Sequence, residues 1–222
     1  MIQLLKRSVL FCGLDEACIE NTLLPQGYLR EYSKGQFLFL PQQRVEHLGI
    51  VISGTVNLIH IFADGNCSLM ATLRPGKVLG ADLACTGSRL APYHAIAMSA
   101  VQVLSFPISL FLSPGSLPEA ARLDVLGRLL TLISNQNMQK EYRLAILAQK
   151  GLRERILTYL TMQAGKRQTA SFSIPFSREE LASFLCVNRS ALSHELSLMQ
   201  QEGLISFHKN TFTLSDVILS PY

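Results

Sequence analysis

The stretch from Ser177 to Leu204 constrains the fold of this chain more than any other. Ser177 is a good N-cap residue, and Glu180 three positions later completes a capping box, so a helix is expected to begin here. After a short interruption, Asn188 can cap a second helix. Each predicted helix has one apolar side, formed by Leu181, Ala182 and Leu185 and then by Leu192, Leu196 and Met199. Two short helices joined by a tight turn are therefore predicted.

The spacing of this stretch is that of a helix-turn-helix unit. Ala182 lets the helices approach closely, residue 186 lies at the turn, and Leu192 fills the angle between them. In such a unit the second helix enters the DNA major groove with its N-terminal residues leading. The polar residues there, which are the candidate base contacts, are Arg189, Ser190, Ser193 and His194. An ordinary helical hairpin with a solvated polar face has the same pattern, so the motif alone leaves both interpretations open.

A hairpin with a polar tip is predicted directly after these helices. The strand-like runs 204–207 and 211–214 flank His208-Lys209-Asn210. A short strand at 172–175 and an amphipathic helix from Arg153 to Ala164 precede the capped helices. Together these elements indicate a winged helix, which an isolated helical hairpin does not explain.

Residues 28–110 have a different character, with turn signals every 8–12 residues. The strand-like runs between these turns are 36–40, 48–52, 55–62, 68–73 and 95–106. Asp64-Gly65 between two of them is a hairpin signal. Many short strands at this spacing predict a small all-β barrel or roll. Residues 1–25 before it are predicted to form a short helix or a helix pair.

A long helix is predicted from Leu117 to about Ala148. Its apolar residues recur every three or four positions, a pattern that suits a helix pairing with its twin. This predicted dimer seam comprises Leu123, Leu126, Leu130, Ile133, Asn137 and Leu144. Asn137 is the polar position that would fix register and partner number. The alternative is a helix that packs only against its own barrel. The length of the helix, more than 25 residues, and its apolar seam favour a homodimer.

Composition places the chain among globular proteins. Its 222 residues, 48% of them hydrophobic, are enough for one large or two smaller domains. No run is long and apolar enough to span a membrane, and the apolar N-terminal stretch is too short for a signal peptide, so we expect a cytoplasmic protein without membrane contact. Lys and Arg exceed Asp and Glu by 12 to 10 before residue 150 and by 8 to 6 from there on. The shorter second part is therefore the more basic, which is compatible with nucleic acid.

The five cysteines do not form a recognisable framework. They are Cys12, Cys18, Cys67, Cys85 and Cys186, an odd number without a CxxC pair. Neither a disulfide framework nor a structural metal site is expected. A thiol redox pair of Cys12 and Cys18 stays open as an alternative.

An enzyme on the barrel is the rival class. A cupin-like metalloenzyme would need a His-x-His with further ligands, but His47, His60 and His94 are scattered singly. There is also no Walker loop, no GxGxxG and no GxSxG. We therefore expect a protein that is not an enzyme and holds no metal.

The order of these segments resembles the CRP/FNR family of bacterial transcription regulators over nearly the full length. The segments that carry the resemblance are LFCGLDEACIENTL, YSKGQFLFLPQQ, LGIVISGTVNL, the FADG hairpin, LRPGKVLG and SREELASFLCVNRSALSHELSLMQQEGLIS. It implies an α+β chain with an effector-sensing β-roll at 1–116, of the kind that binds cyclic nucleotides. A dimerisation helix with its hinge would follow at 117–149, and a winged helix-turn-helix domain at 150–222. The implied partners are double-stranded DNA, a second copy of the chain, RNA polymerase and a small-molecule effector.

The resemblance weakens at the effector pocket. In cyclic-AMP-binding members a Gly-Glu-Leu and a later Arg-Ser-Ala hold the ribose and the phosphate. Here Ala81 replaces the Glu, with Asp82 shifted by one, and Ala91 replaces the Arg. Because a buried phosphate would lose its bidentate guanidinium, cyclic AMP is not expected as ligand. Arg89 lies two residues away and could compensate only through a loop shift.

The pocket implied by the resemblance has altered chemistry but a retained outline. Its candidate residues are Leu79, Gly80, Ala81, Asp82, Leu83, Ala91, Pro92, Tyr93, Ser134 and Met138. An effector there would shift the hinge at 149–151 and reorient the winged helices. A regulator that works without a ligand is the main alternative.

The chain lacks the ligand residues for two cofactors that members of this family use. The iron–sulfur branch needs three closely spaced N-terminal cysteines, and only Cys12 and Cys18 lie there. Haem would need a ligand in the roll or the dimer helix, and His60 and His94 are single strand residues. No cofactor is therefore expected.

At the predicted DNA-reading helix the match is better. The family's small capping residue followed by Arg corresponds to Asn188-Arg189, whereas Ser190 and His194 depart from the cyclic-AMP type. Arg189 would thus contact guanine, and the operator would differ from the cyclic-AMP type. The residues expected to contact the DNA backbone are Ser177, Arg178, Asn188, His208 and Lys209. Cys186 stands where Gly is common and would be strained if the turn needs a positive φ.

Overall fold

The structure, a computed structural model, describes residues 1–62 and 67–215. The hairpin turn expected at Asp64-Gly65 lies outside the described residues. Contacts between residues divide the chain into two compact units, Met1–Gln136 and Asn137–Tyr222. Among the described residues, no helix is long and apolar enough to cross a membrane.

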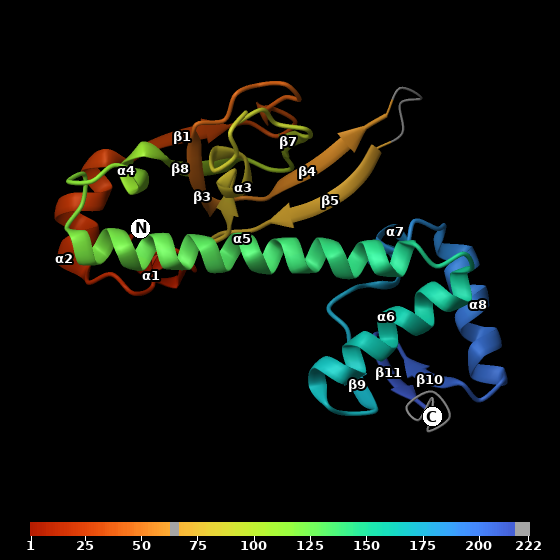
Figure 1. Ribbon diagram of the computed structural model, residues 1–222. Coiled ribbons are helices and arrows are strands. Elements are labelled where there is room, and N and C mark those ends of the chain that lie inside the picture. The colour runs from red at the N-terminus through yellow and green to blue at the C-terminus, as the bar shows by residue number, and fades with distance from the viewer. Residues whose placement is uncertain (63–66, 216–222) are drawn as a thin grey trace. The chain divides into compact units, whose positions relative to one another are not determined.

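The first unit contains a β-roll of two four-stranded antiparallel sheets (Figure 1). One sheet has the order β1 (Tyr28–Tyr32), β8 (Val101–Pro107), β3 (His47–Ser53) and β6 (Val78–Leu79). The other has the order β2 (Phe37–Phe39), β7 (His94–Ala97), β4 (Val56–Ile61) and β5 (Cys67–Leu73). Two short helices accompany them, α3 (Ala81–Ala84) and α4 (Ser109–Leu112). The alternation of apolar residues along these strands fills the space between the sheets, with Val51 and Val103 from one sheet and Val56 and Ala95 from the other.

The prediction of one strand over 95–106 is wrong. The run is two strands, β7 and β8, that belong to different sheets. The chain bends at 98–100, where the Ser99 hydroxyl accepts a hydrogen bond from Thr55 N at 3.1 Å. Because strand-like apolar and small residues continue through the bend, the sequence pattern does not show that the chain changes sheet.

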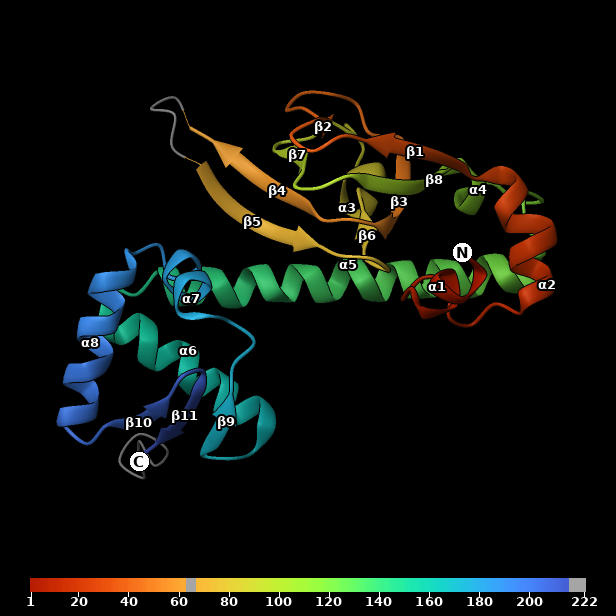
Figure 2. The ribbon, with the colours of Figure 1, turned by 180° about the vertical axis from the view of Figure 1, so that it is seen from behind.

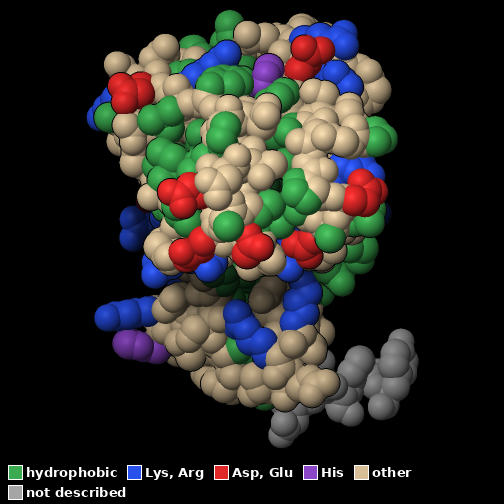
Figure 3. Space-filling view, turned by 90° about the vertical axis from the view of Figure 1, so that its left-hand side faces the viewer, with side chains coloured by type: hydrophobic (Ala, Val, Ile, Leu, Met, Phe, Trp, Pro, Cys, Tyr) green, Lys and Arg blue, Asp and Glu red, His purple; other side chains and the backbone are tan. Residues whose placement is uncertain are grey.

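Short helical turns precede the roll. They are α1 (Ile2–Arg7), α2 (Glu16–Cys18), the π-helical turn η1 (Ile19–Leu23) and the 3₁₀ turn η2 (Leu24–Gln26). Asp15 caps α2, because its carboxylate accepts a 2.6 Å hydrogen bond from Cys18 N. Phe11 is fully buried against Phe106 and Phe111. Figure 3 views the molecule from the side of α2, and acidic and basic side chains lie next to one another on that face of the unit.

The long helix α5 spans Glu119–Leu147 and contributes to both units. Val125 and Leu129 are buried in the core beneath the roll, and Leu126 and Ile133 of the predicted seam pack partly against that same core. The other seam leucines, Leu123, Leu130 and Leu144, are 56%, 69% and 60% exposed, and Asn137 is exposed as well.

The second unit is a small winged-helix domain (Figure 2). Its elements are α6 (Leu152–Arg167), β9 (Ser171–Ser173), α7 (Arg178–Phe184), α8 (Arg189–Gln201), β10 (Ile205–His208) and β11 (Thr211–Leu214). The strands form an antiparallel sheet in the order β10-β11-β9. Helix α6 runs past its predicted end at Ala164 to Arg167, where Gln168 in the left-handed region closes it. The last turns of α5 belong here: Ile146 is buried in the same core as Leu160, Leu192 and Phe212.

Candidate DNA-binding interface

The first helix of the motif begins at the predicted capping box. The Ser177 hydroxyl accepts a hydrogen bond from Glu180 N at 3.2 Å, and the Glu180 carboxylate accepts one from Ser177 N at 2.7 Å. Two backbone donors that a helix start leaves free are thereby satisfied, which fixes where α7 begins.

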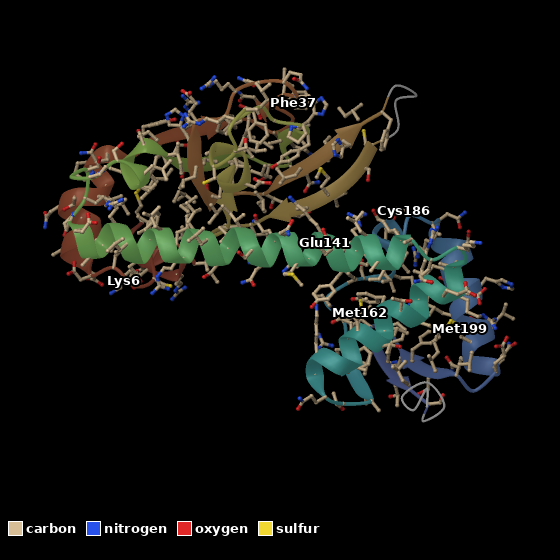
Figure 4. All side chains as sticks on the ribbon, in the orientation of Figure 1. Lys6, Phe37, Glu141, Met162, Cys186 and Met199 are labelled. Carbon is tan, nitrogen blue, oxygen red and sulfur yellow. The ribbon has the colours of Figure 1, made fainter. Side chains whose placement is uncertain are left out.

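The turn between the helices is a Schellman motif. Cys186 has φ +57°, its N–H donates to Ser183 O at 3.2 Å, and Val187 N–H donates to Ala182 O at 3.0 Å. The turn therefore does need a positive φ at residue 186. Cys186, which has a β-carbon, adopts this conformation in place of the more common glycine. Cys186 is exposed at the end of α7 (Figure 4).

The two helices pack as the spacing predicts. Leu192 is fully buried and Ala182 is 3% exposed, so the small residue and the aliphatic one meet in the core of the unit. Met199, farther along α8, is fully buried in this core as well (Figure 4). The apolar side of α8 is thus turned inward, and its opposite side is left for polar residues.

The exposed start of α8 carries most of the predicted base contacts. Arg189, Ser190 and His194 are exposed, while Ser193 is half-buried. The Asn188 side-chain oxygen accepts hydrogen bonds from Ala191 N at 2.7 Å and from the Ser190 hydroxyl at 2.9 Å. Ser190 therefore offers an acceptor rather than a donor to a partner, and Asn188 has only its amide N–H groups free.

Arg178 is held in place by the wing. Its guanidinium lies 4.9 Å from the centre of the Phe207 ring and 5.7 Å from that of Phe212, and it donates to Lys209 O at 3.1 Å. Burial and the nearby charge of Arg189 lower the pKa of Arg178. No ion pair joins Arg178 to any residue that the structure describes. It is therefore a fixed cation without a carboxylate partner among the described residues, close to a second cation.

A hollow of about 430 Å³ lies beside Arg178 between the start of α7 and the wing tip. Its lining residues are Ile174, Pro175, Phe176, Ser177, Arg178, Leu181, Lys209 and Asn210. His208 and Lys209 are exposed, and Lys209 has φ +54° at the tip of the hairpin. Three of the predicted backbone contacts, Ser177, Arg178 and Lys209, are thus brought together around one cationic hollow.

Two arginines that the sequence pattern did not single out hold this motif. Arg153 of α6 donates to Glu195 at 2.6 Å and to both carboxylate oxygens of Glu202, at 2.7 and 2.9 Å. These two carboxylates raise the pKa of Arg153. Arg155 donates to Gln149 O at 2.9 Å and to Leu185 O at 3.3 Å, so it joins the predicted hinge to the end of α7. The partners lie 30 to 49 residues away in sequence for Leu185, Glu195 and Glu202, which is why no local signal could find them.

The predicted effector residues of the roll are mostly buried in its hydrophobic core. Leu79, Ala81, Leu83, Ala91 and Tyr93 are buried.

Gly80 has φ +76°, and Pro92 is exposed. The Tyr93 hydroxyl lies 3.3 Å from both carboxylate oxygens of Asp82, and burial raises the pKa of Tyr93. Ser134 and Met138 of α5 are exposed.

No disulfide joins any of the five cysteines, all of which the structure describes. Within the part of the chain that the structure describes, no group of three or more His, Cys, Asp or Glu is placed to hold a metal ion.

Comparisons with known proteins agree with this arrangement. A cyclic nucleotide-binding domain model matches residues 29–113, and a Crp-like helix-turn-helix domain model matches residues 154–217. The global nitrogen regulator of Synechococcus elongatus is 25% identical over 199 residues, which cover 84% of this chain and 85% of the relative. The nitrogen fixation regulation protein FixK of Azorhizobium caulinodans is 27% identical over 183 residues, covering 79% and 70%.

The solved structures agree in fold. The catabolite activator protein of Thermus thermophilus superposes with a TM-score of 0.56 at 23% identity, covering 96% of each chain. With the roll, the long helix and the winged helix-turn-helix in this order, and both domain models matched in that order, the chain belongs to the CRP/FNR family of DNA-binding transcription regulators.

Proposed function

We propose that this regulator acts as a homodimer that reads a near-palindromic operator, with Arg189 as its main base contact. The observation that carries the proposal is the state of Arg189. It is the first residue of the capped helix α8, it is exposed, and no hydrogen bond or ion pair to a described residue engages its guanidinium. A free guanidinium at this position suits a bidentate contact to guanine O6 and N7.

Affinity for the DNA backbone comes from the cationic hollow at the wing. Arg178 is already oriented by two aromatic rings and a backbone carbonyl, so it loses little side-chain freedom when it contacts a phosphate. Lys209 and His208 at the wing tip, with Ser177 and Asn188 at the two helix starts, complete the proposed backbone contacts. Ser190, Ser193 and His194 supply the weaker base contacts.

The exposed leucines of α5 support the homodimer. Leu123, Leu130 and Leu144 lie at multiples of seven residues on one helix, with the polar Asn137 at the same repeat. Pairing with the same helix of a second copy would remove this apolar stripe from water. A dimer would then present two α8 helices to half-sites about one turn of DNA, roughly 34 Å, apart.

The roll supports an effector other than cyclic AMP. Ala81 and Ala91, at the positions that would hold the ribose and the phosphate, are 2% and 0% exposed, each within a different apolar cluster of the roll. Arg89, which could compensate, instead contacts Glu46 at 3.4 Å. We expect calorimetric titration with cyclic AMP to give no micromolar binding, because no guanidinium meets the phosphate. Micromolar or tighter binding would contradict this.

The proposed route from effector to DNA runs through the hinge at 149–151. A ligand in the roll would favour one of two arrangements of the winged helices. Arg155 supports this route, since it ties the hinge carbonyl of Gln149 to Leu185 next to the helix-turn-helix turn. If operator affinity were the same across metabolite mixtures and thiol redox states, a regulator that needs no ligand would be the better account.

Selection of bound sites from random DNA tests whether the protein binds a specific operator sequence. We expect the wild-type protein to enrich an inverted repeat. Arg189→Gln should lose preference at one base per half-site, at a cost of about 1–3 kcal/mol, and keep its salt-dependent binding. Lys34→Gln in the roll, which removes the same charge, is the control and should enrich the wild-type site. Salt-sensitive binding without any enriched sequence would reduce the function to non-specific association.

A further inference from the structure

A second hollow lies within the first unit, where the edge strands β1 and β2 of the two sheets approach each other. This roll-edge cavity has a volume of about 90 Å³. It can hold a few water molecules or one small ion, and it is far smaller than the roughly 300 Å³ at which drug-sized pockets begin. The cavity is lined by Tyr28, Arg30, Tyr32, Leu38, Phe39, Gln43, Arg44, Val45, Glu46, His47, Gly49, Leu79, Gly80, Val103 and Ser105. Only Leu79 and Gly80 are shared with the expected effector segment.

An unsatisfied hydroxyl lines this cavity. The Tyr28 hydroxyl oxygen is buried, and no hydrogen bond of good geometry joins it to a described residue, although the Ser105 side chain interacts with it and works against the burial that raises the pKa of Tyr28. Tyr28 pairs with Ser105 across β1 and β8, so the two side chains lie on the same face of the sheet. Gly49 neighbours Ser105 on that face and has no side chain to fill the space. Because a buried hydroxyl without a partner costs free energy, the site favours an occupant with a hydrogen-bond acceptor.

The charge around the cavity is positive. The Arg30 guanidinium lies 4.8 Å from the centre of the Tyr28 ring and forms no ion pair with a described residue. The carboxylate of Glu46 is shared between Arg44 at 2.8 Å and Arg89 at 3.4 Å. The cavity lining thus carries two guanidinium groups, Arg30 and Arg44, and one carboxylate, Glu46, and the surplus positive charge favours an anion.

His47 adds a group that can change its charge. Its ring packs edge-on against Tyr28, with ring centres 5.2 Å apart. Burial, and then the charge of Arg30, lower the pKa of His47, while Glu46 acts in the opposite direction. The charged or titratable groups around it are Tyr28, Arg30 and Tyr32 from β1 and Arg44 and Glu46 from the segment before β3. An anion among them would favour the protonated imidazole, so binding of the anion would take up a proton.

We propose that the roll-edge cavity binds a small oxyanion, a carboxylate or a phosphate. The Tyr28 hydroxyl donates a hydrogen bond to it, and Arg30 and His47 supply the charge. The apolar walls formed by Leu79, Val103 and their neighbours strengthen these interactions by excluding water. The site is separate from the DNA-reading surface, so its occupancy can be measured without DNA and does not depend on the proposed operator.

Thermal unfolding of the full chain with inorganic phosphate or acetate, against chloride at equal ionic strength, tests the site. A specific site gives saturable stabilisation that chloride does not give. Tyr28→Phe and Arg30→Gln each should weaken the apparent affinity about tenfold or more, because each loses a charge-assisted interaction. Arg74→Gln, an exposed arginine of the same unit outside the cavity lining, is the matched control and should bind as the wild type does.

The two ions distinguish the sources of the oxyanion and the role of His47. A preference for phosphate indicates a phosphate site, and a preference for acetate indicates a carboxylate site. Acetate stays ionised between about pH 6 and pH 8, so tighter acetate binding at the lower pH reports protonation of His47, and His47→Gln should abolish that dependence. Stabilisation that does not saturate, or that is equal in Tyr28→Phe, Arg30→Gln and the wild type, would overturn the proposal.

Discussion

Cys186 shows how a single residue can work against its own fold. The Schellman turn between α7 and α8 requires the left-handed region there, and Cys186 occupies it with φ +57°. For a residue with a β-carbon this conformation costs roughly 1–2 kcal/mol. Because the Cys186 side chain is exposed, its packing contributes little free energy to offset this strain.

Cys186→Gly should therefore stabilise the protein. The relief of strain is partly offset by the greater freedom of glycine in the unfolded chain, about 0.4–1 kcal/mol, so the expected net gain is about 1 kcal/mol. Urea unfolding under reducing conditions measures it. Cys186→Ala is the control, because it removes the thiol and keeps the β-carbon. Equal stability of the two variants would mean that the turn is not strained.

At the scale of elements, the clamp around Arg153 sets the position of α8. The helix is capped at its start by Asn188, but this cap does not orient it relative to α6. The guanidinium of Arg153 meets Glu195 within α8 and Glu202 directly after it. A planar fork of donors with three short hydrogen bonds fixes direction as well as distance.

Arg153→Gln should weaken binding to the enriched operator several-fold and change non-specific binding little, because the reading residues lose their orientation but the cations remain. Fluorescence anisotropy with operator and scrambled DNA separates the two effects. In a double-mutant cycle with Glu202→Gln, the losses should not add, since both changes break the same contact. Lys34→Gln in the roll matches the change in charge and serves as control. An additive cycle, or equal losses on both DNAs, would contradict a positioning role.

At the scale of the whole molecule, α5 has more apolar surface than one copy of the chain can cover. Val125 and Leu129 face the core beneath the roll, while Leu130 is 69% exposed. An isolated apolar residue on a surface is common, but leucines repeated every seven residues along one helix are the pattern of a helix pair.

Leu130→Glu should therefore prevent formation of the proposed homodimer. Burying a leucine contributes about 1.5–3 kcal/mol, it occurs twice in a symmetric pair, and facing carboxylates would repel. Light scattering after size exclusion should show the mass of one chain, with the circular dichroism unchanged. Leu112→Glu, which alters a leucine 48% exposed on α4, is the control and should remain dimeric. A wild-type protein that is already monomeric would refute the homodimer.

The sequence was most informative where structure depends on neighbours in the chain. The capping box at Ser177, the cap at Asn188 and the pairing of Ala182 with Leu192 all follow from residues within a few turns of each other. Local patterns failed where a strand-like run continues although the chain passes from one sheet to the other, as at 98–100 between β7 and β8. They also failed to divide the apolar residues of α5 between the core and the exposed side.

The sequence by itself determined most of the helices and strands, though not β1, β6, α3 or α4, and which end of α8 carries the candidate base contacts, because hydrogen-bond caps and side-chain periodicity act over short distances. Only the tertiary structure decided which groups meet across long separations. It placed Arg178 on the wing, Arg153 on two distant carboxylates, and Arg30 with His47 around the buried Tyr28 hydroxyl. The charge and burial of a side chain depend on its neighbours in space. The candidate binding sites of both units could therefore be located only from the tertiary structure.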